Sequence, residues 1–306
     1  MYIGFDTSNY TTSVAVFDGE RMINKRELLN VKSGERGLRQ SDAVFQHTVN
    51  MPELINDVDI SDKKISAVAV STRPRNIEGS YMPCFLVGIN NAVTVSRFAD
   101  AQIYKTSHQV GHILAGLYSI NRLDLINEPF IAFHISGGTT EALLVRPDSN
   151  EIITAEIIAQ SSDLKAGQAI DRAGVMMELT FPCGRELDRL SLMSSKEYSV
   201  KPSMNGLDCS LSGVENKAKS MFENGECREN ISKFVLTYIA NSIDEMTQRI
   251  IKKYGEIPVM FVGGVMSNTL IREKITKKYN AYFAEPDLSC DNACGIAIYA
   301  YLKDRK

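Results

Sequence analysis

From Phe130 to Val145 the chain reads Phe-Ile-Ala-Phe-His-Ile-Ser-Gly-Gly-Thr-Thr-Glu-Ala-Leu-Leu-Val. Two apolar runs, Phe130 to Ile135 and Ala142 to Val145, flank the turn residues Ser136-Gly137-Gly138, and this pattern predicts a β-hairpin. Glycines at the tip allow a phosphate or carboxylate to approach the backbone amides without meeting a Cβ atom. The stretch therefore predicts a binding loop, although taken alone it favours an ordinary hairpin whose glycines only supply positive φ angles.

The same pattern opens the chain. A shift of 128 residues lays Ser8-Asn9-Tyr10-Thr11-Thr12 over Ser136-Gly137-Gly138-Thr139-Thr140. Both copies continue into a third strand, over Arg21 to Leu28 in the first copy and over Ile152 to Ala159 in the second. Two β-β-β units, each followed by helices, indicate a diverged internal duplication. This predicts an α/β protein with two similar lobes and a cleft between them.

Between the two copies the sequence predicts further elements. Lys32 to Gln46 is polar and rich in Gly, Ser and Arg, which indicates a loop, and His47 to Val58 is expected to form a helix. Ile65 to Ser71 is typical of a buried strand, and Cys84 to Phe98 has helical apolar spacing.

Composition limits the function classes. The 306 residues suffice for two domains, and 44% hydrophobic with 23% charged residues is ordinary globular composition. A net charge of −3 gives no global attraction to nucleic acid, so a basic RNA-binding surface would have to be local or supplied by a partner. The N-terminus does not resemble a signal peptide and no apolar run approaches a membrane span, so we expect a cytoplasmic protein without a membrane partner. Six cysteines without C-x-x-C spacing suggest free thiols in a reducing compartment.

One pair of histidines has the spacing of metal ligands. The predicted strand Ala101 to Lys105 leads into a helix that carries His108 and His112, and residues four apart share one face of a helix. Packing explains such a pair about equally well. A zinc protease would place Glu directly after the first His, whereas this chain has Gln109, which disfavours metalloprotease activity. Near the C-terminal helix, Asp291 is either an N-cap or a carboxylate aimed into the cleft.

The second lobe offers polar and glycine-rich candidates for a nucleotide site. A helix from Ala166 carries Asp171, the break at Pro182-Cys183-Gly184 follows, and a second helix carries Asp188. The strand Val259 to Val262 then ends in Gly263-Gly264, before a helix from about Ser267. A glycine pair between a buried strand and a helix N-terminus suits a phosphate or ribose, although a tight βα turn also explains it.

Seven motifs in the same order resemble those of one family. The two β-β-β-α-β-α lobes resemble the actin, sugar kinase and Hsp70 ATPase superfamily. Within it the chain is similar to the tRNA threonylcarbamoyladenosine transferases (TsaD/Gcp, formerly O-sialoglycoprotein endopeptidases, peptidase M22-type). The motifs are His108-x-x-x-His112 with Leu114-Ala115, Ile135-Ser136-Gly137-Gly138, Ala166-Gly167-Gln168-Ala169-Ile170-Asp171, Gly184 with Asp188, Ser212-Gly213, Gly263-Gly264-Val265 with Asn268, and Asp291-Asn292-Ala293.

The resemblance implies an activity and its site. A threonylcarbamoyl group would pass from threonylcarbamoyl-AMP to the exocyclic amine of the tRNA adenosine beside the anticodon. His108, His112 and Asp291 would hold one divalent iron or zinc ion. The residues implied for the adenylate of threonylcarbamoyl-AMP, or for ATP, are His134, Ile135, Ser136, Gly137, Gly138, Asp171, Gly184, Asp188, Gly263, Gly264 and Asn268. The first lobe would comprise residues 1–122 and 288–306, the second residues 123–287. tRNA and proteins of the threonylcarbamoylation machinery would be the partners.

The chain also departs from the family pattern. Tyr10-Thr11 replaces an acidic pair, Thr139 replaces a histidine, and Arg73-Pro74-Arg75 replaces a Gly-Pro-Gly turn. A loop with Arg36 and Arg39 replaces a Gly-Gly-Val-Val-Pro-Glu stretch. The added arginines suit an anionic small acceptor as well as an RNA backbone.

Two alternatives therefore stand beside the tRNA reaction. The first is a diverged carbamoyl or acyl transferase, or an ATP-dependent kinase, that acts on a small molecule. The second is a non-catalytic actin-like partner subunit. Retention of all three candidate metal ligands argues against this second alternative, because a scaffold needs no open metal site.

Overall fold

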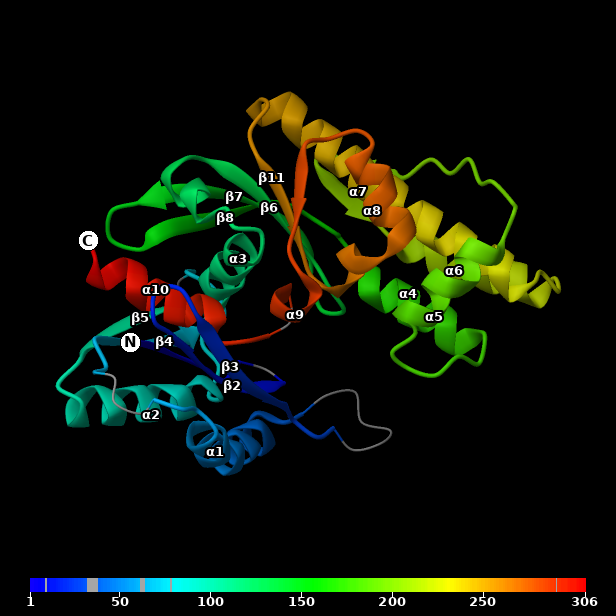
Figure 1. The fold of residues 1–306 in the computed structure, drawn as a ribbon. Helices are drawn as coiled ribbons and strands as arrows, with labels where there is room; N and C mark the ends of the chain where they lie inside the picture. The colour runs from blue at the N-terminus through cyan, green and yellow to red at the C-terminus, as the bar shows by residue number, and fades with distance from the viewer. Residues whose placement is uncertain (9, 32–37, 61–63, 78, 290) are drawn as a thin grey trace. The chain divides into compact units, whose positions relative to one another are not determined.

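The computed structural model describes residues 1–8, 10–31, 38–60, 64–77, 79–289 and 291–306 (Figure 1). Of the added arginines named above, Arg36 lies outside these described residues. The chain divides into two compact units. Unit 1 comprises Met1–Glu128, Arg146–Ala155 and Asp287–Lys306, and unit 2 comprises Pro129–Val145 and Glu156–Pro286. The short segment 146–155 thus belongs with unit 1, whereas the second lobe expected from the sequence, residues 123–287, includes it.

Unit 1 is built on a five-stranded sheet with the order β3-β2-β1-β4-β5. β1 pairs antiparallel with β2 and parallel with β4, and β4 pairs parallel with β5. The strands are β1 (Tyr2–Asp6), β2 (Thr11–Phe17), β3 (Met22–Leu28), β4 (Ala67–Arg73) and β5 (Gln102–Ser107). The helices are α1 (Gln40–Asn56), α2 (Phe85–Phe98), α3 (His108–Ser119), the 3-10 turn Leu123–Asn127 and α10 (Cys294–Asp304).

The two faces of this sheet are covered by different helices. Side chains at alternate positions of β1, including Ile3 and Phe5, join the apolar core beneath α1 and α2, which lie side by side in Figure 1. On the opposite face Gly4 lies against the backbone of α10, because a Cβ at this position would meet backbone atoms of Ala293 and Ala297. Helix α3 packs on α10. The C-terminal helix is therefore an integral layer of unit 1.

Unit 2 repeats this arrangement. Its five-stranded sheet has the order β12-β11-β6-β7-β8, in which β6 pairs antiparallel with β7 and parallel with β11, and β11 pairs parallel with β12. The strands are β6 (Phe130–Ile135), β7 (Thr140–Asp148), β8 (Ile152–Gln160), β11 (Val259–Val262) and β12 (Ala281–Phe283), with a separate hairpin of β9 (Ser203–Asn205) and β10 (Asp208–Ser210). The helices are α4 (Ala166–Met176), α5 (Gly184–Met193), α6 (Ser212–Glu223), α7 (Arg228–Tyr254), the 3-10 turn Gly264–Ser267 and α8 (Thr269–Thr276), and the short helix α9 (Pro286–Ser289) follows β12.

The matching strand orders confirm the predicted duplication and the α/β fold class. In each unit an antiparallel three-stranded meander supplies one half of the sheet, and strands that return parallel to the first supply the other. One prediction was wrong. The helix expected over His47 to Val58 begins at Gln40, inside the segment predicted to be a loop.

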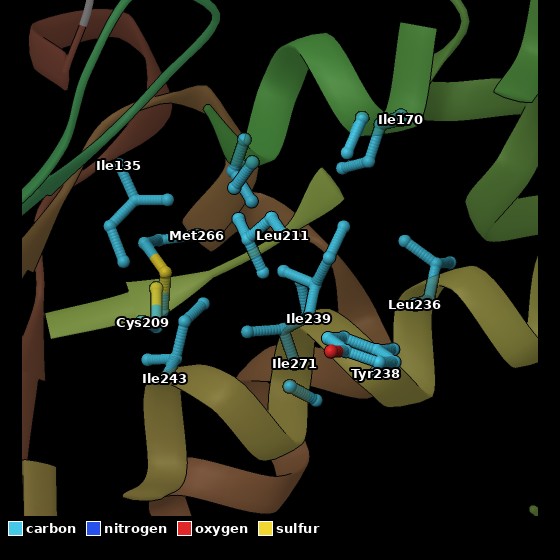
Figure 2. Close-up of a cluster of buried hydrophobic side chains, with 14 of the residues drawn as sticks. Ile135, Ile170, Cys209, Leu211, Leu236, Tyr238, Ile239, Ile243, Met266 and Ile271 are labelled. Carbon is cyan, nitrogen blue, oxygen red and sulfur yellow. The ribbon is translucent and has the colours of Figure 1, made fainter. Parts of the chain in front are cut away.

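The core of unit 2 lies between its sheet and its helices. Figure 2 shows Ile135 from the sheet and Ile239 and Ile243 from α7 among the buried side chains of this cluster. Phe133, Phe261 and Phe283 stack across the three parallel strands, with ring centroids 4.7 and 5.2 Å apart. Among the described residues, no helix combines the length and the apolar character needed to cross a membrane.

One carboxylate holds together the connections that lead into α4 and α6. Asp163 accepts hydrogen bonds from the Ser210 hydroxyl at 2.6 Å, from the Leu211 amide at 2.8 Å and from the Ser212 amide at 3.2 Å. It also accepts the amide of Leu164 at 2.6 Å. Partial burial raises the pKa of Asp163, but these hydrogen bonds outweigh burial and hold that pKa below its usual range.

We predict that Asp163→Asn lowers the free energy of unfolding by about 1–3 kcal/mol at pH 7, because an amide cannot replace a charged acceptor of several hydrogen bonds. The ordinary pKa is 3.8 and the folded value is lower, so the stabilisation is present above pH 3.8 and lost as the pH falls through the folded value. Urea unfolding of both proteins from pH 7 to pH 3 measures this difference. As a control, Asp148→Asn alters an exposed-turn carboxylate that accepts the amides of Asn150 and Glu151, where asparagine is well tolerated, and should change stability little. Equal losses in the two variants would contradict the role of Asp163.

Candidate functional site

Helices α3 and α10 touch through their backbones. A Cβ atom on Gly295 would overlap the carbonyl oxygen of Gly111 and would lie 2.8 Å from the amide nitrogen of Ala115. A Cβ on Gly111 would lie 2.7 Å from Cδ1 of Ile296. Only glycine permits this close approach, which is why two segments far apart in sequence share one corner of unit 1.

Three candidate metal ligands meet at this corner. The Nε2 atom of His112 lies 2.9 Å from Oδ1 of Asp291, and Nε2 of His108 lies 3.4 Å from the same oxygen. One nitrogen of each imidazole and one carboxylate oxygen all lie within 4.8 Å of one another. His112 is 6% exposed, His108 18% and Asp291 30%, so the cluster opens to solvent on the Asp291 side. The arrangement can present two nitrogens and one oxygen to a single ion.

A fourth side chain, Asp6 at the end of β1, contacts the other nitrogen of His108. Its Oδ2 atom lies 2.6 Å from Nδ1 of His108, and the carboxylate is only 1% exposed. Asp6 is not among the site residues predicted from the sequence. Its position at the end of a predicted strand could have identified it, because carboxylates at the carboxyl ends of strands frequently belong to binding sites in α/β folds.

The electrostatics of the corner favour positive charge. Burial lowers the pKa of His108, but the carboxylates of Asp6 and Asp291 outweigh burial and raise this pKa to about 10. Burial raises the pKa of Asp291, but the two histidines hold that pKa well below its usual range. Two carboxylates around the imidazoles therefore stabilise a cation here.

Side-chain hydrogen bonds cap the starts of α3 and α10, close to the candidate ligands. The hydroxyl of Ser107 accepts the amide of Val110 at 3.3 Å and so caps the start of α3. At the start of α10 the side chain of Asn292 accepts the amide of Cys294 at 2.9 Å. Of the two roles considered for Asp291, the structure favours the carboxylate that faces the histidines, since Asn292 makes the capping bond.

In unit 2, the turn 136–138 lies at the N-terminus of α4. The amide of Gly167 donates to the carbonyl of Ser136 at 3.2 Å, and the amide of Ala166 donates to the Thr140 hydroxyl at 2.8 Å. A Cβ on Gly167 would lie 2.6 Å from Cα of Gly137, so the helix and the turn are in direct contact. Gly137 and Gly138 are exposed and have open space where a Cβ would project. Turn and helix together make a site at which an anion can approach backbone amides.

The second glycine turn lies beside the first. Gly263 has φ +102°, and a Cβ there would collide with the carbonyl of Ile135, so this turn adjoins the end of β6. Gly264 has open space at its Cβ position, and α8 begins at Thr269 after a 3-10 turn. His134 pairs with Glu141 across β6 and β7. The predicted residues at the end of β6 and after β11 are therefore neighbours.

The remaining candidates of unit 2 form two hydrogen-bonded groups. The carboxylate of Asp188 accepts the Asn268 side-chain amide at 2.9 Å and the Thr269 hydroxyl at 2.9 Å, and Asn268 caps α8 through the amide of Ile271. Asp171 accepts the amide of Cys183 at 2.9 Å, immediately before Gly184. Burial raises the pKa of Asp171 above its usual value, because its effect is larger than the opposite effect of the Cys183 hydrogen bond.

The arginine turn predicted for the acceptor side adjoins the histidine helix. Arg73 is the last residue of β4, and the carbonyl of Pro74 accepts the amide of Gln109 at 3.0 Å. Because Gln109 directly follows His108, the backbone that carries Arg73 and Arg75 is one hydrogen bond away from the metal-ligand helix. Arg39 directly precedes α1.

Comparisons with known proteins agree with this architecture. A family model described as tRNA N6-adenosine threonylcarbamoyltransferase, TsaD, matches residues 37–298. The chain is 26% identical over 320 residues to the tRNA N6-adenosine threonylcarbamoyltransferase of Streptococcus gordonii, a match that covers 99% of this chain and 91% of that protein.

Solved structures show the same fold at low sequence identity. HypF in its phosphate- and nucleotide-bound form gives a TM-score of 0.61 at 14% identity, over 99% of this chain and 55% of HypF. The ROK hexokinase of Thermus thermophilus gives a TM-score of 0.51 at 13% identity and covers 99% of each chain. These structures confirm the predicted two-lobed fold class related to the sugar kinases.

We predict that Gly295→Ala lowers the free energy of unfolding by about 1–3 kcal/mol, because the added methyl group overlaps the backbone of α3 and forces α10 away. Thermal and urea unfolding measure the effect. The matched control is Gly213→Ala, also a helical glycine, whose Cβ would find no atom closer than 3.7 Å and should leave stability equal or slightly raised. If Gly295→Ala proves as stable as the control, the backbone contact is not as close as described.

Proposed function

Because the chain belongs to the TsaD family of tRNA N6-adenosine threonylcarbamoyltransferases, we propose that it transfers a threonylcarbamoyl group from threonylcarbamoyl-AMP to a tRNA adenosine beside the anticodon. The adenosine N6 amine would attack the carbamoyl carbon, the bond from that carbon to the phosphate oxygen would break, and AMP would leave. The amine proton would pass to solvent. No covalent protein intermediate is needed for this exchange.

The observation that carries the proposal is the meeting of His108, His112 and Asp291. Two imidazoles and one carboxylate suit divalent iron or zinc, and the negative charge around the imidazoles fits a cation. A bound ion of this kind would act as a Lewis acid toward a carbonyl or phosphate oxygen. The chain's own contribution is to hold the three ligands with α3 packed directly on α10.

The adenylate would be held by unit 2. The exposed turn at Gly137 and Gly138 would offer its backbone amides to a phosphate, and the N-terminus of α4 would add the positive end of its helix dipole. Such fixed donors stabilise the charge that gathers on the phosphate as AMP leaves. The Oδ1 atom of Asp171 is occupied by the Cys183 amide, which fixes the carboxylate so that its second oxygen can accept from a ribose hydroxyl.

Asp188 would act through its neighbours. Its carboxylate binds the side chains of Asn268 and Thr269, so it holds the start of α8 and orients the Asn268 amide. A ligand that also contacts Asp188 would meet a carboxylate already fixed by these bonds.

A second candidate is transfer to a small anionic acceptor, and one observation favours it. The carbonyl of Pro74 accepts the amide of Gln109, the residue after His108. The two arginines that flank Pro74 are therefore attached to backbone that lies against the start of α3. Guanidinium groups bind carboxylates and phosphates in bidentate fashion.

We predict that the protein restores threonylcarbamoyladenosine in a strain that lacks its own transferase but keeps the usual partner proteins. His112→Ala should lower the modified nucleoside about 100-fold or more, because one of three ligands is lost. Nucleoside analysis of purified tRNA and metal analysis of both proteins are the measurements. The control Arg122→Ala removes a charge that pairs with Asp124 after the end of α3 and should leave both readouts unchanged. Absence of the nucleoside with soluble, metal-loaded wild-type protein would contradict the tRNA reaction and favour the small acceptor.

We predict that Asp188→Ala weakens AMP or ATP binding about tenfold or more, since the change frees Asn268 and Thr269 and removes a charge-assisted acceptor. Calorimetric titration measures the affinity. Arg189→Ala is the matched control on the same helix, because Arg189 is 58% exposed and pairs with Glu186. An unchanged affinity of the Asp188 variant would show that the nucleotide binds elsewhere.

A further inference from the structure

Asp6 is held in place from several directions. Its Oδ1 atom accepts the amide of Ser8 at 2.8 Å, and its backbone carbonyl accepts the hydroxyl of Ser13 at 3.2 Å. Asp6 also pairs with Ser13 in the antiparallel ladder of β1 and β2. With 1% of its side chain exposed, the carboxylate has neither solvent nor rotational freedom. It is a rigid hydrogen-bond acceptor.

The ring of His108 is clamped between this acceptor and the candidate metal centre. Nδ1 lies 2.6 Å from Oδ2 of Asp6, whereas Nε2 lies 3.4 Å from Oδ1 of Asp291 and 3.4 Å from the Ser8 hydroxyl. A carboxylate only accepts hydrogen bonds, so Nδ1 must carry the hydrogen. In the neutral imidazole the lone pair then resides on Nε2, the nitrogen that faces Asp291.

We propose that Asp6 is a positioning residue of the metal centre, which fixes the tautomer and orientation of His108 so that Nε2 is presented to a divalent cation. This inference rests on the proposed function, since it presupposes that His108, His112 and Asp291 bind a metal. A ligating histidine typically donates its other N–H to a carboxylate or carbonyl, which orients the ring and makes the ligating nitrogen more basic.

The geometry argues against Asp6 as a direct ligand. Its carboxylate lies on the Nδ1 side of the ring, and the two ring nitrogens point in different directions. Both of its oxygens are already engaged, by Ser8 and by His108. The described residues that gather ligand atoms within 4.8 Å are His108, His112 and Asp291, without Asp6. A direct ligand would need a different side-chain orientation and the loss of both bonds.

The test is Zn²⁺ affinity, measured by competition with a chromophoric chelator on full-length metal-free protein. Asp6→Asn should weaken Zn²⁺ binding about 10- to 100-fold, because the amide lacks the charge and allows the opposite tautomer. The matched control is Asp18→Asn. Asp18 also accepts backbone hydrogen bonds, from the amides of Glu20 and Arg21 in the turn between β2 and β3, and its replacement should leave Zn²⁺ affinity unchanged.

A second measurement uses the wild-type protein and needs no variant to fold. Nitrogen-15 NMR of the Zn²⁺-loaded protein, with labelled histidine, should show His108 protonated at Nδ1 and ligated through Nε2. A third measurement compares the visible absorption spectra of the Co²⁺-loaded wild type and Asp6→Asn. We expect the two spectra to differ, and a purely structural role of Asp6 would not produce this difference.

The outcomes separate the two levels of inference. Zn²⁺ binding by the wild type with equal affinity in Asp6→Asn, or ligation of His108 through Nδ1, would overturn the positioning role and leave the proposed function standing. A wild-type protein without Zn²⁺ affinity would overturn the metal centre and the role of Asp6 together. Weakened binding in folded Asp6→Asn, with Nδ1 of His108 protonated in the wild type, would support the role.

Discussion

The contact on which unit 1 depends is the backbone-to-backbone approach of α3 and α10 at Gly111 and Gly295. Hydrophobic burial alone would allow these helices to pack at the wider separation that side chains normally impose. Two glycines remove that separation. As a result His112, one residue after Gly111, comes within hydrogen-bond distance of Asp291, four residues before Gly295. The geometry of the candidate metal centre thus depends on helix packing, together with the short segment before α10 in which Asp291 lies.

Much of the fold could be predicted from local patterns, because strand alternation and glycine turns recur in both halves of the chain. The start of α1 could not. The buried positions of this helix are Ala43, His47, Met51 and Leu54, and its first turns contribute only the small Ala43 within a polar segment. A helix whose first turns bury so little apolar area resembles a loop in sequence.

The candidate site could be predicted only in part, because tertiary contacts bring some of its residues together. The four-residue spacing of His108 and His112 is local and visible in the sequence, whereas Asp291 joins them through the tertiary contact of α10. Only the family resemblance could supply it. The hydrogen bonds of Asp6 and of Asp188 depend on which strand end or helix start lies opposite each carboxylate. No pattern along the chain encodes that information for a single residue.

The discontinuity of unit 1 has a consequence for biosynthesis. Residues 156–286, which make up most of unit 2, are synthesised before residues 287–306. Until those later residues have been made, the sheet of unit 1 lacks the α10 layer against Gly4, and His112 lacks the carboxylate of Asp291. The nascent chain therefore passes through a stage in which the elements proposed to hold the nucleotide have all been synthesised, while the corner proposed to bind the metal is still incomplete. Any premature capture of metal by His108 and His112 would have to occur with two protein ligands instead of three.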